Sequence, residues 1–201
     1  VLAVSAVTGS VFAQRGTAPA VNQETAIVPF KVQVPDAVLA DLKQRLARTR
    51  FPGEIAGSNW DYGTNLGYLK ELVTYWRDSF DWRAAERRLN QFNQFTTTID
   101  GLDIHFIHQR SKNPNALALA VTHGWPGSVV EFGKIIGPLT EPTAHGGSAN
   151  DAFHVVAISL PGFGFSGKPT ERGYSPERIA GVIATLMARL GYTKYGLQGG
   201  D

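Results

Sequence analysis

Cysteine is absent from all 201 residues of this sequence. Its absence excludes disulfide bonds, thiolate metal sites and cysteine nucleophiles within these residues, but leaves the cellular compartment open. Neither sign of charge predominates, because 19 lysines and arginines are mixed with 17 aspartates and glutamates for a net charge of +2. Without a basic stripe, nucleic acid is not an expected partner.

The apolar segment at the start of the chain is too short to span a membrane, which takes about 20 apolar residues. It reads VLAVSAVTGSVFA and carries no charge. A small residue at its end is typical of a signal-peptidase site, so we interpret residues 1–13 as the remnant of a secretory signal peptide and 14–27 as a linker. We therefore expect export to the periplasm or the exterior. A membrane anchor truncated at its front and a cloning remnant are the alternatives.

Hydrophobic residues make up 43% of the sequence, enough for a core. Residues 28–94 show helical periodicity, with one helix after Pro35-Asp36, a second from Thr64 to Ser79 and a third after Asp81. The sides expected to be buried are Val38, Leu39, Leu42 and Leu46 in the first helix, and Leu66, Leu69, Leu72, Val73 and Trp76 in the second. We expect the aromatic residues of this region to pack in the core or under a lid; substrate contact is the alternative.

From residue 95 onward the periodicity changes. Two alternating runs, FTTTI and LDIHFIH, flank Asp100-Gly101, which predicts a β-hairpin. Three apolar runs follow, ALALAVTH, FHVVAISL and KYGLQ, and are expected to be strands buried on both faces. Ser175-Pro176-Glu177 begins a helix with its apolar side on Ile179, Val182, Ile183, Leu186 and Leu190. The expected fold is α/β: an antiparallel hairpin leading into a mostly parallel sheet, preceded by the helical region.

Ligand sites in such sheets lie beyond the carboxyl ends of the strands, which selects three segments: 123–128, 161–168 and 199–201. The second contains GFGFSG, which matches a dinucleotide-binding pattern. No helix opens at its last glycine, because Pro169 and Gly173 intervene, and no acidic residue follows at the usual distance. We therefore expect a surface turn there, in which Ser166 is not a nucleophile.

The first and third segments together indicate catalysis. In THGWPGS, a turn formed by His123, Gly124, Trp125 and Pro126 can aim the backbone N–H of Trp125 at a developing negative charge. In the terminal GGD, two glycines permit the sharp strand-to-helix turn of a nucleophile elbow, with Asp201 at its top. Taken alone, HGWPG is an ordinary glycine-proline turn.

Several motifs together resemble the microsomal-type epoxide hydrolases of the α/β-hydrolase superfamily. They are HGWPGS, SLPGFGFSGKP, the terminal GGD, PFKVQVPDAVLADLKQRLARTRFP and WDYGTNLGYLKELVTYWRDSFDWRAAERRLNQF. The similarity covers about 28–201 and departs at Asn93, where the family usually has proline. It implies that residues 28–94 are the family's N-terminal region and that 95–201 are the first half of the α/β-hydrolase fold, up to the nucleophile elbow.

An aspartate at the elbow indicates a different chemistry from that of a serine, which attacks acyl carbon and needs a histidine to take its proton. With an unperturbed pKa of about 3.9, Asp201 is already ionised at neutral pH and can attack without a base. Its natural target is a strained or activated saturated carbon, which gives a covalent alkyl-enzyme ester that a histidine-activated water then hydrolyses. The resemblance implies an apolar epoxide as substrate and a vicinal diol as product, without a cofactor or metal.

The remaining catalytic groups are expected after Asp201. The resemblance assigns proton donation to lid tyrosines, and in this fold the acid and the histidine base follow the nucleophile. All five histidines precede it, so His123 is expected to orient the turn and these residues alone are expected to be inactive. A hydrolytic haloalkane-type dehalogenase and a non-catalytic binding module for apolar ligands remain the alternatives.

Overall fold

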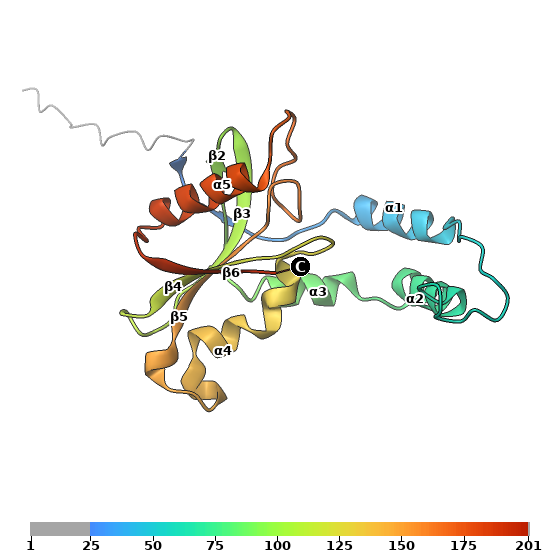
Figure 1. Ribbon diagram of the computed structural model, residues 1–201, viewed down its shortest axis with the longest axis horizontal. Helices are drawn as coiled ribbons and strands as arrows, with labels where there is room; N and C mark the ends of the chain where they lie inside the picture. Colours follow the sequence, from blue (N-terminus) through green and yellow to red (C-terminus); the bar gives the residue numbers. More distant parts are fainter. Residues whose placement is uncertain (1–24, 201) are drawn as a thin grey trace, which may run out of the picture.

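A computed structural model describes residues 25–200. The predicted signal remnant 1–13, most of the linker 14–27 and the predicted nucleophile Asp201 lie outside them. Six strands form one mixed sheet (Figure 1). Their order is β1 (Val28–Phe30), β2 (Gln94–Ile99), β3 (Leu102–Gln109), β5 (Phe153–Ile158), β4 (Leu117–Thr122) and β6 (Tyr195–Gly199).

The predicted hairpin is confirmed. Strands β2 and β3 pair antiparallel from Ile99 opposite Leu102 down to Gln94 opposite Ile107. Between them Asp100 and Gly101 have φ angles of 51° and 73°. Positive φ at both turn residues matches the right-handed twist of the two strands, and Asp-Gly is among the pairs that adopt it most readily.

The second half of the sheet is parallel, as predicted. Strand β3 pairs antiparallel with β5, whereas β4 runs parallel to both β5 and β6. The carboxyl ends of β4, β5 and β6 therefore share one edge of the sheet. The expectation of burial on both faces holds for β5 and for most of β4, although Leu117 at the start of β4 is 43% exposed. It does not hold for β6, whose Leu197 is 61% exposed at the sheet edge.

Helices cover both faces of the sheet (Figure 1). Helix α5 (Pro176–Arg189) is capped by the Ser175 hydroxyl and packs on one face, with Val182, Ile183 and Leu186 buried as predicted. The other face is covered by a 3-10 helix, η2 (Val129–Lys134), and by α4 (Ile136–Thr140). Two short 3-10 turns, η3 (Pro142–His145) and η4 (Ala149–Asp151), complete the connection to β5.

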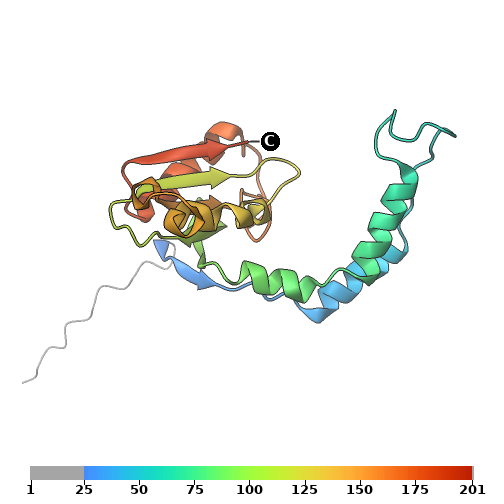
Figure 2. The ribbon, with the colours of Figure 1, turned by 90° about the horizontal axis from the view of Figure 1, so that it is seen from below.

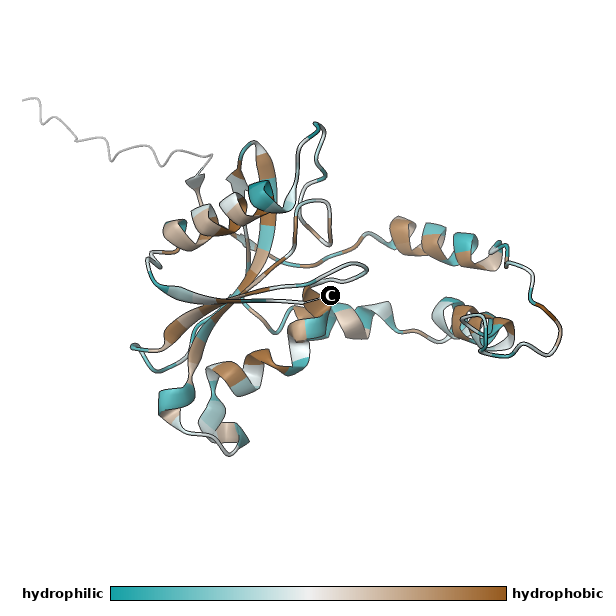
Figure 3. Ribbon diagram, viewed as in Figure 1, coloured by the Kyte–Doolittle hydropathy of each residue, from teal (hydrophilic) through white to brown (hydrophobic). Residues whose placement is uncertain are grey.

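Residues 36–78 of the N-terminal region form an arm that lies away from the sheet (Figure 2), rather than a second hydrophobic core. Helices α1 (Asp36–Ala47) and α2 (Leu66–Asp78) lie side by side, away from the sheet (Figures 1 and 2). Hydrophobic segments recur along α1 as they do in the central strands (Figure 3). The expected burial is wrong for Val38 of α1 and for Leu72 and Trp76 of α2, which are exposed. The two helices lie away from the sheet (Figure 2), so the main core does not cover these side chains. Leu46 is buried as predicted.

Two polar side chains tie the start of the arm to the body. Strand β1 was not anticipated in a region predicted to be helical; it pairs antiparallel with β2. The chain then crosses α3 (Trp82–Leu89), where Asn90 accepts the N–H of Val32 at 2.9 Å and donates to its carbonyl at 2.8 Å. Glu86 accepts the N–H of Val34 at 2.7 Å. These bonds satisfy the polar backbone of a segment that has no strand partner there.

Among residues 25–200, no helix combines the length and hydrophobicity that a membrane crossing requires.

Candidate active site

Three predicted segments meet at the carboxyl edge of the parallel strands. Thr122, the last residue of β4, lies opposite both Ile158 of β5 and Gly199 of β6. Figure 2 shows β4 and β6 pointing the same way, so the residues after each strand emerge together. The turn at 123–128, the loop at 159–167 and Gly200 are therefore neighbours.

His123 links the turn to the neighbouring loop. Its ring is buried, and its Nε2 accepts the backbone N–H of Leu160 at 3.2 Å. Because a backbone amide only donates, Nε2 is unprotonated, and Nδ1–H donates to the carbonyl of Gly124 at 3.0 Å. The ring of Phe163 meets the imidazole at its edge, with centroids 5.3 Å apart. Both ring nitrogens are engaged, as expected of an orienting group rather than a base.

The rest of the turn depends on a close backbone approach at Gly127. A Cβ there would lie 2.8 Å from the carbonyl oxygen of Gly124 and 2.7 Å from Oε1 of Glu131, too close for any side chain. The Trp125–Pro126 peptide bond is cis, and the Trp125 side chain is 74% exposed. Ser128 then begins η2 with a capping box closed by Glu131.

Of the two glycines before Asp201, Gly199 has a packing role that the sequence did not indicate. The predicted elbow turn involves Asp201, outside residues 25–200, so the role of both glycines in that turn stays a prediction. Neither Gly199 nor Gly200 has a positive φ angle. Instead, Gly199 passes close to β4, where a Cβ would lie 2.7 Å from Oγ1 of Thr122. Small size at this position therefore allows β6 to approach β4.

The GFGFSG loop is a compact turn that folds back on β3. Gly162 and Gly164 have φ angles of 88° and 54°, and Gly167 donates its N–H to the carbonyl of Asp103 at 2.7 Å. The first helix after it is α5, capped by Ser175, so no helix N-terminus meets the loop as dinucleotide binding requires. The expected surface location is wrong for Ser166, which is only 8% exposed.

The other histidines stand apart from the turn. His105 and His108 belong to β3, His154 to β5 and His145 to η3. Burial lowers the pKa of both His105 and His108 to about 4, so neither is protonated at neutral pH. Within the part of the chain that the structure describes, no group of three His, Cys, Asp or Glu side chains could hold a metal ion.

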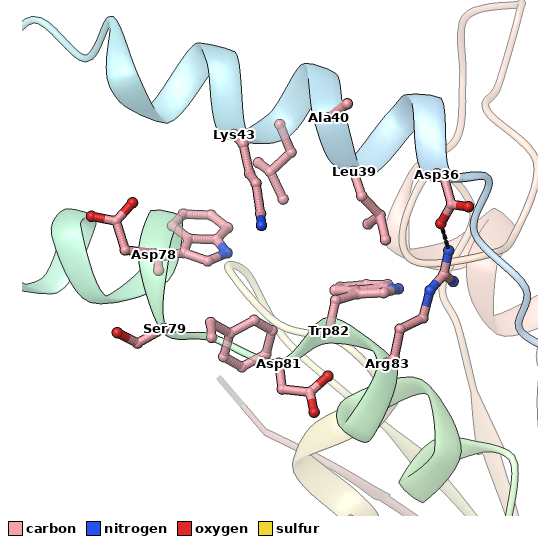
Figure 4. Close-up of a pocket in the computed structure, with 12 residues that line it drawn as sticks. Asp36, Leu39, Ala40, Lys43, Asp78, Ser79, Asp81, Trp82 and Arg83 are labelled. Atoms are coloured by element: carbon pink, nitrogen blue, oxygen red, sulfur yellow. Dashed lines mark hydrogen bonds and ion pairs between the residues drawn. The ribbon is translucent and has the colours of Figure 1, made fainter.

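A cavity of about 550 Å³ lies away from this edge (Figure 4). All its lining residues fall within 36–83, between α1 and the segment that joins α2 to α3. Several of them are charged, and Arg83 pairs with Asp36 at its rim. Asp78 and Asp81 are also ion-paired, with Arg77 and Arg87. We therefore assign no catalytic role to this cavity.

Two family models match the chain. The epoxide hydrolase N-terminus model matches residues 27–132, and the alpha/beta hydrolase fold model matches residues 118–201. Among curated relatives, a putative epoxide hydrolase of Stigmatella aurantiaca is 57% identical over 87% of this chain, and epoxide hydrolase 1 of Sus scrofa is 42% identical over 92%. The matches span only 40% and 42% of the length of these two relatives.

Solved structures agree with the sequence matches. The juvenile hormone epoxide hydrolase of the silkworm Bombyx mori superimposes with a TM-score of 0.78 at 36% identity, over 89% of this chain and 42% of that one. The Aspergillus niger epoxide hydrolase gives a TM-score of 0.76 at 37% identity, over 89% of this chain and 47% of that one. The chain thus spans less than half the length of the proteins it matches.

Proposed function

Because the chain belongs to the epoxide hydrolase family of the α/β-hydrolase superfamily, we propose that the full-length protein opens an epoxide ring with Asp201 and releases a vicinal diol. The observation that carries this proposal is the pairing of Thr122 with Gly199. This pairing brings the end of β6, which leads through Gly200 to Asp201, beside the turn that begins at His123.

In the proposed first step, a carboxylate oxygen of Asp201 attacks one epoxide carbon. The carbon–oxygen bond of the ring breaks, and its electron pair stays on the ring oxygen as an alkoxide. Strain in the three-membered ring supplies the driving force, so an ionised aspartate suffices as nucleophile. The alkoxide must be protonated, which we assign to lid tyrosines beyond residue 201.

In the proposed second step, a water activated by a histidine beyond residue 201 attacks the carboxyl carbon of the ester. The negative charge that develops on the carboxyl oxygen is stabilised by the backbone N–H of Trp125. Losing one such donor typically costs about 3 kcal/mol of transition-state stabilisation. Collapse of the intermediate breaks the bond between the carboxyl carbon and the alkyl oxygen, which takes the proton that the histidine removed from water and leaves as the diol hydroxyl. The second proton of the water restores the tyrosine donor, and Asp201 is regenerated as a carboxylate.

Isotope labelling tests this mechanism in the full-length protein. In a single turnover of styrene oxide in H₂¹⁸O, we expect the label in the carboxyl group of Asp201 and unlabelled oxygen in the diol, because water attacks the ester and not the epoxide. Label in the diol in that first turnover would contradict an ester intermediate. Asp201→Asn should abolish diol formation.

A haloalkane assay separates the proposal from its main rival. The same aspartate could displace a halide, so the full-length protein is incubated with styrene oxide and with a haloalkane in parallel. We expect turnover of the epoxide alone. Halide release without diol formation would favour a dehalogenase, and tight binding of an apolar ligand without turnover would favour a binding module.

We further propose that the protein is exported, on the basis of the small apolar residues at 1–13. The mature N-terminus is then expected near Gln14. N-terminal sequencing of the protein from the periplasm or medium of its native cell tests this, and recovery of residues 1–13 on the mature protein would contradict it.

A further inference from the structure

His105 lies at the centre of a buried polar cluster outside the predicted site. Its ring has no exposed surface, with Nδ1 2.9 Å from the hydroxyl of Ser159 and Nε2 3.1 Å from Oε1 of Gln94. The rings of Phe30 and Phe165 meet it at the edge, with centroids 4.9 and 5.3 Å away. Every polar atom of the ring is satisfied within the protein, as burial requires.

The partners fix the protonation of the ring. The amide nitrogen of Gln94 donates to the carbonyl of Leu89 at 3.0 Å and to Oδ1 of Asn90 at 3.3 Å, so its oxygen faces His105. Nε2 of His105 must therefore carry the proton, and Nδ1 accepts from the hydroxyl of Ser159. A neutral ring in this state agrees with the lowered pKa of about 4.

Both ends of the 159–167 loop are tied to His105. Ser166 accepts the backbone N–H of His105 at 2.9 Å and donates its hydroxyl to the carbonyl of Ser159 at 2.6 Å. Gly164 packs on Ser159, because a Cβ at position 164 would lie 2.9 Å from the hydroxyl oxygen of Ser159. The hydroxyl of Ser159 is thus confined between the imidazole and the loop backbone.

Leu160, the residue after Ser159, connects the 159–167 loop to the 123–128 turn. Leu160 donates its N–H to His123, and His123 donates to the carbonyl of Gly124. That carbonyl and the N–H of Trp125 belong to one peptide unit, which is planar. Fixing the direction of the carbonyl therefore fixes the direction of the N–H, the donor on which the second catalytic step depends.

We propose that His105 is a positioning residue for the oxyanion donor, acting through Ser159, Leu160 and His123. The inference rests on the proposed function, because the peptide it orients is the proposed oxyanion donor. It has a distinctive consequence: loosening the turn slows hydrolysis of the ester but not its formation, so the alkyl-enzyme should accumulate.

The test compares His105→Phe with a matched control, His108→Phe, in the full-length protein. Phenylalanine keeps the ring volume but loses both ring hydrogen bonds of His105. His108 lies on the same strand, has the same lowered pKa and bonds the hydroxyl of Tyr192 at 2.9 Å, away from the loop. Ser159→Ala removes one hydrogen bond of the cluster with a smaller perturbation, and it decides the question if His105→Phe does not fold.

With styrene oxide as substrate, we expect His105→Phe to lower kcat by about tenfold or more while kcat/KM changes by less than about threefold. Rapid quenching followed by intact-mass measurement should show a larger fraction of covalent adduct than in wild type, and Ser159→Ala should shift it in the same direction. If His105 had only a structural role, His105→Phe would lower the fraction of active enzyme without changing the share of that enzyme present as covalent adduct. Equal adduct fractions in His105→Phe and His108→Phe would overturn the inference.

A spectroscopic readout keeps the inference separate from the proposed function. In ¹⁵N-histidine NMR spectra, the ring signals of His123 should change in His105→Phe and remain as in wild type in His108→Phe. Unchanged His123 signals in both variants would overturn the positioning role. Wild-type protein that forms neither adduct nor diol would instead refute the proposed function, while the NMR comparison would still judge the coupling of the two histidines.

Discussion

Single atoms decide the geometry of the 123–128 turn. The carbonyl oxygen of Gly124 receives the Nδ1–H of His123 and lies against Gly127, where a Cβ has no room. The sequence identified the turn residues, because HGWPG between a strand and a helix is a local signal. It did not reveal that Leu160, 37 residues further along the chain, donates to His123, because only the fold brings them together.

Gly127→Ala should therefore lower activity by disturbing the turn. The new Cβ would lie 2.8 Å from the Gly124 carbonyl, so the peptide that carries the Trp125 N–H must move. We expect kcat of the full-length protein for styrene oxide to fall by about 100-fold, as when an oxyanion donor is lost. The control is Gly133→Ala in η2, where a Cβ would meet no atom within 4 Å. Equal activity of the two variants would contradict this role of Gly127.

Burial of His105 should also make stability depend on pH. Its folded pKa of about 4 lies below the unfolded value of about 6.5, so the unfolded chain binds the proton first as pH falls. The free energy of unfolding should decrease between about pH 6.5 and 4, by up to about 3 kcal/mol from this group. Denaturant midpoints across this range should fall less steeply in His105→Phe than in wild type. Parallel curves would contradict the assignment.

Local signals predicted the elements that local contacts form. Asp100-Gly101 marked the hairpin, and Ser175-Pro176 marked the start of α5; both are confirmed. Strand β1 could not be predicted, because its three residues pair with β2, more than 60 positions away in sequence. Helical periodicity predicted α2 itself, but the side expected to be buried is not: no residue of α2 is buried, and Leu72 and Trp76 are exposed.

The segment after β1 depends on a side chain that replaces a strand partner. Asn90 holds the backbone of Val32 at both its N–H and its carbonyl, and Val32 is only 1% exposed. Asn90→Ala leaves both groups unsatisfied and should destabilise the protein by about 1–3 kcal/mol. Hydrogen exchange at the Val32 amide should become faster. Gln91→Ala, at an exposed neighbouring position, should change stability by less than about 0.5 kcal/mol; an equal effect of both variants would refute the role of Asn90.

Across the whole molecule, one series of hydrogen bonds connects the N-terminal region to the catalytic edge. It runs from Val32 to Asn90 and Gln94, and then through His105 to Ser159. The sequence places these residues in four separate segments, and none of them lies in 123–128 or 199–201, the two segments that indicated catalysis. The contribution of the N-terminal region to the site is therefore a property of the fold rather than of any one segment.

If this series acts as a unit, substitutions at its two ends should not be additive. Asn90→Ala and His105→Phe share Gln94 as a partner, so a double-mutant cycle on unfolding free energy should give a coupling of at least about 0.5 kcal/mol. Asn90→Ala with His108→Phe is the control, because His108 bonds Tyr192 instead, and there the effects should add. Additivity in both cycles would mean that Gln94 does not couple Asn90 to His105 energetically. The N-terminal region and the catalytic edge would then be stabilised independently.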